Sequence, residues 1–495
     1  MKTIHGMLEN NAKKHPNKDA LITATVRMSY PELNAKVNQI ARCLQESGVQ
    51  KGNRIAIIST NNEHFFFAYF SLLKIGAIPM PVNVKLTSPE IHAILTNVDA
   101  DGIIFEHEFN TTINTILETW SSALVFTIKQ LLDQSRIQDQ TNLNLPIDTN
   151  DICEILFTSG TTGVPKGVVF SHKNVLTLTQ AIATEFNFTA KDKALTIMPL
   201  SHSAPLNNFT LAPIYAGASV VVDNFTPQAF LQWIDDEKTT FTFVAPVAYL
   251  LTAKQENMND YDLSSMRVFA YGGSAMPLAT FNYVTKRFAN KNFYQVYGLT
   301  EAGPNGSLLR PHEHITKSGS IGNKPVINME LKIVAEDGKE TAPNEYGEIL
   351  LKGDSVMAGY YNNPEATANA IKDGWLYTGD IAYKDEDDYM YIIDRKKDVI
   401  IPGGVNVYPR EIEEVLTNHP AIYQACVVGV PDEKWGETVK AVIVLKDDQL
   451  LTETELHEYL ATYLADYKQP RIYRFVDELP HSASGKILKQ QVKEM

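Results

Sequence analysis

Short apolar runs alternate with amphipathic segments along the N-terminal half of the chain. Apolar residues at helical spacing predict helices that begin near Tyr30, at Glu63 and at Ser88, where Pro89 suits the first helical turn. The runs between them predict buried strands at Arg54–Ser59, Ala77–Val82 and Gly102–Phe105. Phe65, Phe66 and Phe67 belong to the second predicted helix and are expected in the core. This alternation indicates parallel α/β units.

The alternation continues towards the middle of the chain. After a polar loop at Gln138–Asp151, a helix is predicted at Asn174–Phe186. Further apolar runs predict strands at Ala194–Met198, Ser219–Val222, Phe241–Val244, Arg267–Tyr271 and Phe293–Tyr297. Beyond Ile321 the pattern changes to shorter strands separated by acidic turns, at Glu348–Lys352 and Met390–Ile393. These strands predict a smaller β-rich lobe.

Five consecutive charged residues, Asp394–Asp398, separate two apolar runs. Because charges are costly to bury, they predict a surface linker. A small α+β unit follows, with helices at Arg410–Leu416 and Glu453–Leu464 and strands at Ala425–Val430, Val439–Leu445 and Tyr473–Val476. We therefore predict an α/β fold with a large N-terminal domain, residues 1–394, that combines parallel α/β sheets with a β-rich lobe. A small mobile α+β C-terminal domain, residues 395–495, completes it.

Composition narrows the class of protein. A chain of 495 residues is too long for one ordinary hydrophobic core. Its composition, with 44% hydrophobic and 21% charged residues, is normal for a soluble globular protein. A net charge of −14 disfavours nucleic acid or anionic membrane as a partner. Cys43, Cys153 and Cys426 are widely spaced, which predicts neither a disulfide framework nor a metal site. With no signal-like or membrane-spanning segment in view, a cytoplasmic location is expected.

The richest chemistry lies between two apolar runs, in Thr158-Ser159-Gly160-Thr161-Thr162-Gly163-Val164-Pro165-Lys166-Gly167. The pattern reads as strand, loop, strand. Glycines allow backbone N–H groups to converge, hydroxyls add donors and Lys166 adds a positive charge, so the loop suits a polyphosphate anion. Pro165 before the lysine departs from the common nucleotide-binding loop, which leads into a helix. Composition alone would also allow a flexible surface turn.

The ten-residue string resembles the signature of the adenylate-forming superfamily, which includes acyl-CoA synthetases, luciferases and peptide-synthetase adenylation domains. Other motifs of the family follow in order, so the resemblance covers essentially the whole chain. It implies ATP and CoA as substrates, Mg²⁺ as the metal ion, and a carboxylic acid that is first adenylated and then transferred to a thiol. The signature loop then holds ATP through Thr158, Ser159, Gly160, Thr161, Thr162, Gly163 and Lys166.

The resemblance also assigns the other nucleotide residues. Glu301 follows the strand that ends at Tyr297 and could be a solvated turn residue or a metal ligand. The resemblance favours the metal ligand. It also implies that Thr300 contacts phosphate and that Tyr297 packs against adenine. Gly273 and Ser274 follow another strand end, which could be a simple turn. By resemblance they approach adenine, while ribose and the rest of the nucleotide contact Asp380, Ile392 and Arg395.

Two lysines carry the predicted catalytic and conformational roles. Lys486 lies on a Ser/Gly loop where a lysine is usually just solvated, but it resembles the family's catalytic lysine, whose charge stabilises the adenylation transition state. Because it belongs to the second predicted domain, closure would assemble the site. Lys397 matches the hinge position of the family.

The remaining site residues concern the acid and the thiol. The acyl pocket is assigned to His202, Tyr271, Gly272 and Gly298, although Ser201 and Pro205 depart from the family pattern around the histidine. From the residues alone, Trp435 could be a core aromatic as well as a ligand contact, and the lysines of this region could be ordinary surface residues. The resemblance nevertheless assigns CoA binding to Gly403, Gly404, Lys434, Trp435 and Lys468.

The expected activity is that of an AMP-forming acid–thiol ligase. The strings Asp373-Gly374-Trp375 and Pro431–Glu437 most resemble bacterial fatty-acyl-CoA ligases, which predicts a medium- or long-chain fatty acid. The alternatives are an aromatic-acid ligase, such as a succinylbenzoate–CoA ligase, and an adenylation enzyme that loads a carrier protein. A non-catalytic nucleotide-binding relative is disfavoured because Lys486, Glu301 and Asp380 are all present. A homodimer is compatible with the sequence.

Overall fold

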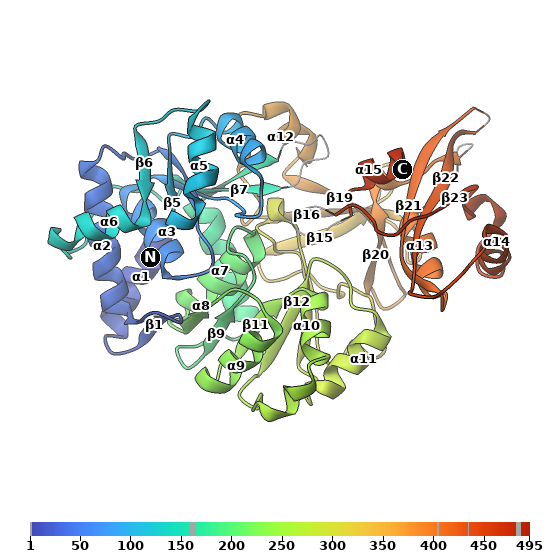
Figure 1. Ribbon diagram of the computed structural model, residues 1–495, viewed down its shortest axis with the longest axis horizontal. Helices are drawn as coiled ribbons and strands as arrows, with labels where there is room; N and C mark the ends of the chain where they lie inside the picture. Colours follow the sequence, from blue (N-terminus) through green and yellow to red (C-terminus); the bar gives the residue numbers. More distant parts are fainter. Residues whose placement is uncertain (1, 159–164, 403–404, 434, 482–486) are drawn as a thin grey trace. The chain divides into compact units, whose positions relative to one another are not determined.

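The structure is a computed structural model that describes residues 2–158, 165–402, 405–433, 435–481 and 487–495 (Figure 1). The chain divides into two units, Met1–Leu331 with Leu350–Tyr377, and Lys332–Ile349 with Thr378–Met495. Three strands run from one unit into the other: β15 (Met329–Val334), β16 (Gly347–Gly353) and β19 (Trp375–Lys384). The functional division after residue 394 stays a prediction.

The first predicted α/β units form a four-stranded parallel sheet of order β4-β3-β5-β6. Its strands are β3 (Arg54–Ile58), β4 (Ile78–Pro81), β5 (Gly102–Phe105) and β6 (Leu124–Thr127). The neighbouring helices are α1 (Ile4–Lys14), α2 (Tyr30–Glu46), α3 (Glu63–Ile75), α4 (Ser88–Asn97), α5 (Asn110–Leu117) and α6 (Ile128–Gln134), in the blue to cyan part of Figure 1. The parallel pairing confirms the sequence prediction for this region.

The helices begin where side chains can satisfy the free N–H groups of the first turn. Ser29 and Glu32 form a reciprocal capping box at α2, and Thr87 and Glu90 form another at α4. Asn62 caps α3 by accepting a hydrogen bond from the His64 N–H at 2.8 Å. Local sequence therefore determines these starting points.

Helix α3 is apolar on all sides because it is almost wholly enclosed. Every residue from Phe65 to Ile75 is buried, which confirms that Phe65, Phe66 and Phe67 are core residues. Gly76 ends the helix with a φ of +80°, a conformation that glycine adopts without strain. The helix packs against α2 and leads directly into β4.

The second sheet has eight strands in the order β14-β13-β12-β11-β9-β10-β1-β2. Pairing is parallel except at the two ends, β13–β14 and β1–β2. Its strands are β1 (Asp19–Ile22), β2 (Arg27–Ser29), β9 (Lys193–Thr196), β10 (Ser219–Val222), β11 (Phe241–Val244), β12 (Val268–Gly272), β13 (Phe293–Tyr297) and β14 (Ser307–Leu309).

Helices connect these strands and enclose an aromatic core that includes Phe230, Tyr249, Phe269 and Phe293. They are α7 (His172–Glu185), α8 (Ala212–Tyr215), α9 (Pro227–Glu237), α10 (Pro246–Ala253) and α11 (Leu278–Arg287). An eight-residue π-helix, Ala204–Leu211, precedes α8 and is almost completely buried. π-Helices are rare and concentrate at functional sites, and the sequence analysis did not predict this one.

A third, antiparallel sheet of order β17-β8-β7 flanks the predicted phosphate loop. β7 (Ile152–Thr158) and β8 (Lys166–Ser171) pair along their length, and β17 (Gly359–Tyr360) adds to β8. The two flanking strands of the loop are thus confirmed. Ser159, Gly160, Thr161, Thr162 and Gly163 lie outside the described residues.

The second unit contains the antiparallel pair of β19 with β20 (Met390–Arg395) and the sheet β21-β22-β23. The latter strands are β21 (Ile422–Asp432), β22 (Gly436–Leu445) and β23 (Ile472–Phe475). Its helices are α13 (Pro409–Thr417), α14 (Glu453–Ala461) and α15 (Lys489–Glu494). In the first unit, α12 (Pro364–Ala370) precedes β18 (Ile371–Lys372), which pairs with the start of β19. These elements confirm the predicted β-rich lobe and small α+β unit.

One prediction for the charged run is wrong. Asp394 is not part of an exposed linker: it lies in β20 and is 6% exposed. One carboxylate oxygen accepts a hydrogen bond from the Arg410 N–H at 2.8 Å, in the first turn of α13. Burial of this charge is tolerated because a free helix N–H group satisfies it. The other four residues are half-buried or exposed.

The three cysteines are unbridged and buried, as the sequence predicted for a chain without a disulfide framework. None of the helices in the described part of the chain has the length and apolar character needed to cross a membrane.

Glu154 is an unexpected carboxyl group in the core, on the first strand of the hairpin. It lies on β7, is fully buried, and accepts hydrogen bonds from the Tyr69 hydroxyl and from Nδ2 of Asn207, both at 2.7 Å. Burial raises the pKa of Glu154 to about 7, although the two hydrogen bonds oppose the shift. The folded chain therefore retains a proton that an exposed carboxyl group would already have lost.

Replacing Glu154 with Gln is expected to flatten the pH dependence of stability. The stabilisation from the raised pKa is fully present below the ordinary value of 4.5 and is lost as pH rises through about 7. Urea midpoints of the wild type should fall more between about pH 5 and pH 8 than those of Glu154→Gln. Glu108→Gln, which changes an exposed carboxylate, should follow the wild type. Parallel curves for wild type and Glu154→Gln would contradict the shift.

Candidate active site

The predicted metal ligand Glu301 is positioned by a close backbone contact after β13. A Cβ on Gly298 would lie 2.1 Å from the carbonyl oxygen of Pro304, so only glycine fits there. The chain then forms a 3-10 turn, Thr300–Ala302, that carries Thr300 and Glu301 as half-buried side chains. Tyr297, at the end of the strand, is buried. The sequence thus places these three residues together at one strand end.

Tyr360 joins Glu301 to the lysine of the phosphate-loop hairpin. Its hydroxyl donates a hydrogen bond to Oε1 of Glu301 at 2.9 Å, and Nζ of Lys166 lies 5.0 Å from the centre of its ring. Burial, followed by the adjacent Glu301 carboxylate, raises the pKa of Tyr360 well above its ordinary value, so the hydroxyl is a neutral donor. The sequence analysis missed Tyr360 because no local pattern relates it to residues so distant in the chain.

Glu301 also has the properties of a magnesium ligand. Mg²⁺ prefers hard oxygen ligands and typically takes only one or two protein carboxylates beside phosphate oxygens and water. A half-buried carboxylate whose direction is fixed by Tyr360, near the hairpin that carries Lys166, meets that requirement. No group of three potential metal-ligating side chains occurs among the residues the structure describes.

The segment after β12 allows close approach to backbone. A Cβ on Gly272 would lie 2.7 Å from the Val296 carbonyl oxygen, whereas one on Gly273 would meet nothing within 4 Å. Gly273 has a φ of +80°, and the neighbouring Ser274 is exposed. Open space beside a glycine in this conformation is compatible with a flat ligand lying against the backbone.

Tyr271 is less accessible than a pocket residue usually is. It is 1% exposed, and its hydroxyl lies 3.0 Å from Nε2 of His314. The hydroxyl also donates to Oε1 of Gln295 at 3.3 Å, and Nδ1 of His314 lies 2.9 Å from the Arg310 carbonyl oxygen. Its assignment to the acyl pocket stays a prediction, and any contact with substrate would need this packing to open.

The loop before α3 holds the segment that carries His202. Asn61 is buried, donates to the carbonyl oxygens of Met198 and Asp223 at 2.8 and 3.1 Å, and accepts from the Leu200 N–H at 3.0 Å. His202 follows two residues later and is half-buried. Asn61 is therefore a positioning residue that sequence reasoning did not find.

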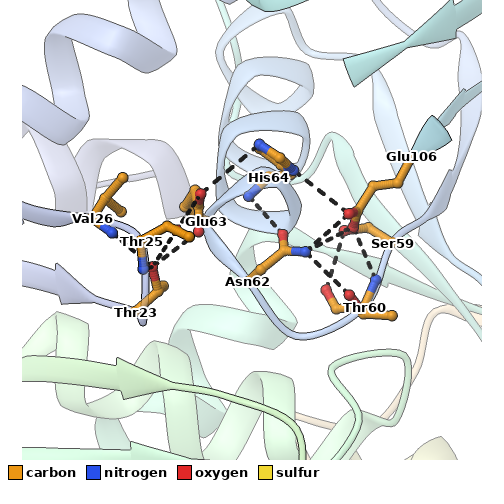
Figure 2. A network of polar contacts seen from close by, with 9 residues as sticks. All are labelled: Thr23, Thr25, Val26, Ser59, Thr60, Asn62, Glu63, His64 and Glu106. Atoms are coloured by element: carbon orange, nitrogen blue, oxygen red, sulfur yellow. Dashed lines mark hydrogen bonds and ion pairs between the residues drawn. The ribbon is translucent and has the colours of Figure 1, made fainter. Parts of the chain in front are cut away.

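A polar network fixes that loop in turn (Figure 2). The Glu106 carboxylate receives hydrogen bonds from Ser59, the Thr60 N–H and Asn62. His64 lies between two carboxylates, 3.6 Å from Glu106 and 3.9 Å from Glu63. The contact with Glu106 raises the pKa of His64 despite partial burial. These contacts hold the β3–α3 connection in one conformation.

In the second unit, the two predicted nucleotide residues of β19 and β20 form an ion pair. Nε of Arg395 lies 2.8 Å from Oδ1 of Asp380, directly across the strand pair. Asp380 is 3% exposed, and its own N–H donates to Thr378 at 3.0 Å. Arg395 also donates to the Thr378 carbonyl oxygen at 3.2 Å. The buried carboxylate is thus oriented before any ligand arrives.

Glu348 supports this arrangement from β16. Its carboxylate accepts the Gly379 N–H at 3.0 Å and lies 2.9 Å from Nζ of Lys396. Gly379 has a φ of +71°. Ile392, also predicted to contact the nucleotide, lies on β20 opposite Ala382. Glu348 is a further residue that no motif revealed.

The remaining predicted residues lie in or beside the second unit's loops. Burial lowers the pKa of Lys397, which lies in the 3-10 turn Lys396–Asp398 after β20. Nζ of Lys468 lies 2.6 Å from Oε1 of Glu411, and Trp435 is 51% exposed, so it is not a core aromatic. Gly403, Gly404, Lys434 and Lys486 lie outside the described residues.

Comparisons with known proteins agree with this geometry. The family model described as AMP-binding enzyme matches residues 8–361, and the AMP-binding enzyme C-terminal domain matches residues 411–486. The chain therefore belongs to the AMP-binding enzyme family. This confirms the resemblance to the adenylate-forming superfamily and the predicted enzyme class, an AMP-forming acid–thiol ligase.

The individual relatives have different acids in their names. The chain is 34% identical over 485 residues to a feruloyl-CoA synthase of an Amycolatopsis species, covering 97% of this chain and 96% of that protein. It is 32% identical over 507 residues to a long-chain-fatty-acid–CoA ligase of Mycobacterium tuberculosis, covering 100% and 98%. The solved o-succinylbenzoate CoA synthetase of Bacillus subtilis, bound to its acyl-adenylate, has a TM-score of 0.90 at 29% identity, covering 99% and 98%. This similarity confirms the predicted fold class.

Tyr360→Phe is expected to raise the Mg²⁺ concentration needed for half-maximal ATP-dependent turnover about fivefold or more. The change removes the hydrogen bond that orients Glu301 but keeps the ring near Lys166, and hydrogen bonds to charged groups contribute about 1.5–3 kcal/mol. The measurement is the initial rate at saturating ATP over a Mg²⁺ series. Tyr361→Phe is the matched control, because that hydroxyl accepts from Arg54 at 2.6 Å instead. Equal Mg²⁺ dependence in both variants would contradict the assigned role.

Proposed function

We propose that the protein is an ATP-dependent carboxylate–CoA ligase that forms an acyl-adenylate and then a thioester. The contact chain from Glu301 through Tyr360 to Lys166 carries the proposal, since it gathers a carboxylate for Mg²⁺ and a cation for phosphate beside the signature hairpin. The ion pair of Asp380 with Arg395 supports it with an oriented carboxylate for ribose hydroxyls. CoA as the thiol is supported by the names of the relatives.

In the first step, a carboxylate oxygen of the acid attacks the α-phosphorus of ATP. The bond to the bridging oxygen breaks and pyrophosphate leaves. The phosphates would be held by Lys166, Thr300 and the signature loop. Adenine would be held by Tyr297, Gly273 and Ser274. Glu301 would hold Mg²⁺, which would neutralise phosphate charge. Positioning and electrostatic stabilisation supply most of the catalysis in such reactions.

In the second step, the CoA sulfur attacks the carbonyl carbon of the mixed anhydride and AMP leaves. The thiol proton is lost to solvent, so no protein nucleophile is required. We assign the first step's cationic stabilisation to Lys486 and the change of conformation between steps to a rotation at Lys397. Gly403, Gly404, Lys434, Trp435 and Lys468 remain the proposed CoA residues, and His202, Tyr271, Gly272 and Gly298 the proposed acyl residues.

A medium- or long-chain fatty acid remains the predicted substrate, with an aromatic acid as the alternative. Relatives with both kinds of name support either choice. A cytoplasmic location and a homodimer likewise stay predictions.

The decisive measurement is pyrophosphate release from ATP across aliphatic and aromatic acids, each with and without CoA. Continuous release that requires both one acid and CoA is expected. A single-turnover burst that CoA does not affect would instead indicate a carrier protein as acceptor. No release with any acid of the panel would contradict the proposed activity on these substrates.

Lys486→Ala is expected to suppress adenylation by about a hundredfold or more while largely sparing thioester formation from supplied acyl-adenylate, because its charge stabilises only the first transition state. Each half-reaction is measured separately by single-turnover kinetics. Lys493→Ala removes an exposed lysine seven residues further along the chain and should leave both steps unchanged. Equal losses in the two half-reactions would refute the role of Lys486.

Lys397→Pro is expected to spare adenylation and block thioester formation, because proline fixes φ at the proposed hinge. Lys397→Ala removes the same charge without this restriction and should retain the second step. If thioester formation proceeds normally in Lys397→Pro, or fails equally in both variants, rotation at this residue is not what the second step requires.

A further inference from the structure

Buried polar atoms without hydrogen-bond partners concentrate in one region of the first unit. Ten such side-chain atoms occur among the residues the structure describes. Five of them belong to four residues: Ser203 Oγ, Asn207 Oδ1, Asn208 Oδ1, and both Oδ1 and Nδ2 of Asn305. All four residues are at most 5% exposed, so a ligand, like one that contacts Tyr271, would reach them only when this packing opens. Because buried polar groups are nearly always paired, this concentration requires an explanation.

These residues lie around the predicted acyl site. Nδ2 of Asn208 donates to the Pro304 carbonyl oxygen at 3.3 Å, and that oxygen is the one that excludes a Cβ from Gly298. The backbone nitrogen of Asn305 would lie 3.1 Å from the same Cβ position. Ser203 directly follows His202 and precedes the π-helix that carries Asn207 and Asn208. The cluster thus joins the segment of His202 to that of Gly298.

Existing contacts decide which atoms remain available. Nδ2 of Asn207 is held by the Glu154 carboxylate, and Nδ2 of Asn208 by the Pro304 carbonyl oxygen. Turning either amide would bring two acceptors together, so the two unpaired atoms are carbonyl oxygens. Asn305 offers a donor and an acceptor, and Ser203 offers a hydroxyl. The complementary ligand group must donate a hydrogen bond and can also accept one, a requirement that a hydroxyl group meets.

Two stacked aromatic rings belong to the same region as the cluster. Phe209 of the π-helix stacks on Phe243 with ring centres 4.3 Å apart, and Phe243 lies 3.2 Å from the Cβ position of Gly272. An unsubstituted chain placed beside this wall would leave the amide atoms unpaired. A few polar groups on an otherwise apolar wall are the usual means of selecting one ligand.

We propose that the acid substrate carries a hydroxyl group besides its carboxylate, and that Asn208 and Asn305 select it. The inference rests on the proposed function, because it specifies the acid of that same reaction. The hydroxyl can belong to an aromatic ring or to an aliphatic chain. In either case, a substrate without it buries unpaired amide atoms, which lowers its kcat/KM.

The first test compares matched acids in the pyrophosphate-release assay. Para-hydroxycinnamate is compared with cinnamate and with para-methoxycinnamate, which keeps the oxygen but cannot donate. Dodecanoate is compared with its chain-hydroxylated derivatives at successive positions. We expect at least one hydroxylated acid to exceed its parent about tenfold or more in kcat/KM, with the methoxy compound behaving like the parent. If every parent acid equals or exceeds its hydroxylated partners, permanently bound water satisfies the cluster and the proposal is wrong.

The second test uses Asn305→Leu, a change of similar size. Asn305 makes no side-chain hydrogen bond in the structure, so its loss should not lower the melting temperature. The preference for hydroxyl is expressed as kcat/KM for the hydroxylated acid divided by kcat/KM for its parent acid. The variant should reduce this ratio about fivefold or more. Asn38→Leu, which alters a buried amide on α2 far along the chain, should leave that ratio unchanged even if it destabilises the fold.

The two proposals fail in distinguishable ways. Absence of pyrophosphate release with every acid contradicts the proposed function. Robust release that does not discriminate hydroxylated from parent acids contradicts only the hydroxyl inference. A ratio that Asn305→Leu leaves unchanged would show that the preference arises elsewhere, which also overturns the assignment to this cluster.

Discussion

The hydrogen bond from Tyr360 to Glu301 fixes the relative positions of the groups on which the proposed chemistry depends. Tyr360 lies on a two-residue strand that pairs with β8, and Glu301 lies in a turn after β13. These belong to different sheets, so their contact sets the hairpin of the phosphate loop against the end of the larger sheet. A second contact, from the Met357 N–H to the Glu301 carbonyl oxygen at 2.9 Å, makes the connection less dependent on one side chain. Precise placement of charge before substrate arrives is what electrostatic catalysis needs.

Several carboxylates in this protein are buried, and each is accommodated differently. Asp380 is balanced by Arg395, and Asp394 by a helix N–H group. Glu154 instead has only neutral donors, and burial raises its pKa to about 7. A charge that is paired can remain ionised in the core, whereas one with neutral neighbours tends to take up a proton. The proposed role of Asp380, binding ribose hydroxyls as an anion, would use its ion pair with Arg395.

Much of the fold could be predicted because its signals are local. Strand and helix limits followed from apolar runs, from caps such as Ser29 with Glu32, and from Gly76. The resemblance located most candidate site residues, since they lie within contiguous motifs. Tyr360, Asn61 and Glu348 could not be found in this way, because their significance arises from contacts with residues far away in the sequence. Asp394 was misjudged for the same reason: its partner, Arg410, belongs to the next helix.

The π-helix shows how such a long-range effect bears on specificity. Its sequence, Ala204–Leu211, has no feature that distinguishes it from an ordinary helix of apolar and polar residues. In the structure, it directs consecutive asparagines to different partners, Glu154 of β7 and Pro304 of the segment after Glu301. Each amide nitrogen donates a hydrogen bond to the protein, and each amide oxygen has no hydrogen-bond partner in the structure. The amide donors of Asn207 and Asn208 thus have structural partners already, and the proposed substrate hydroxyl would give the oxygen of Asn208 a partner as well.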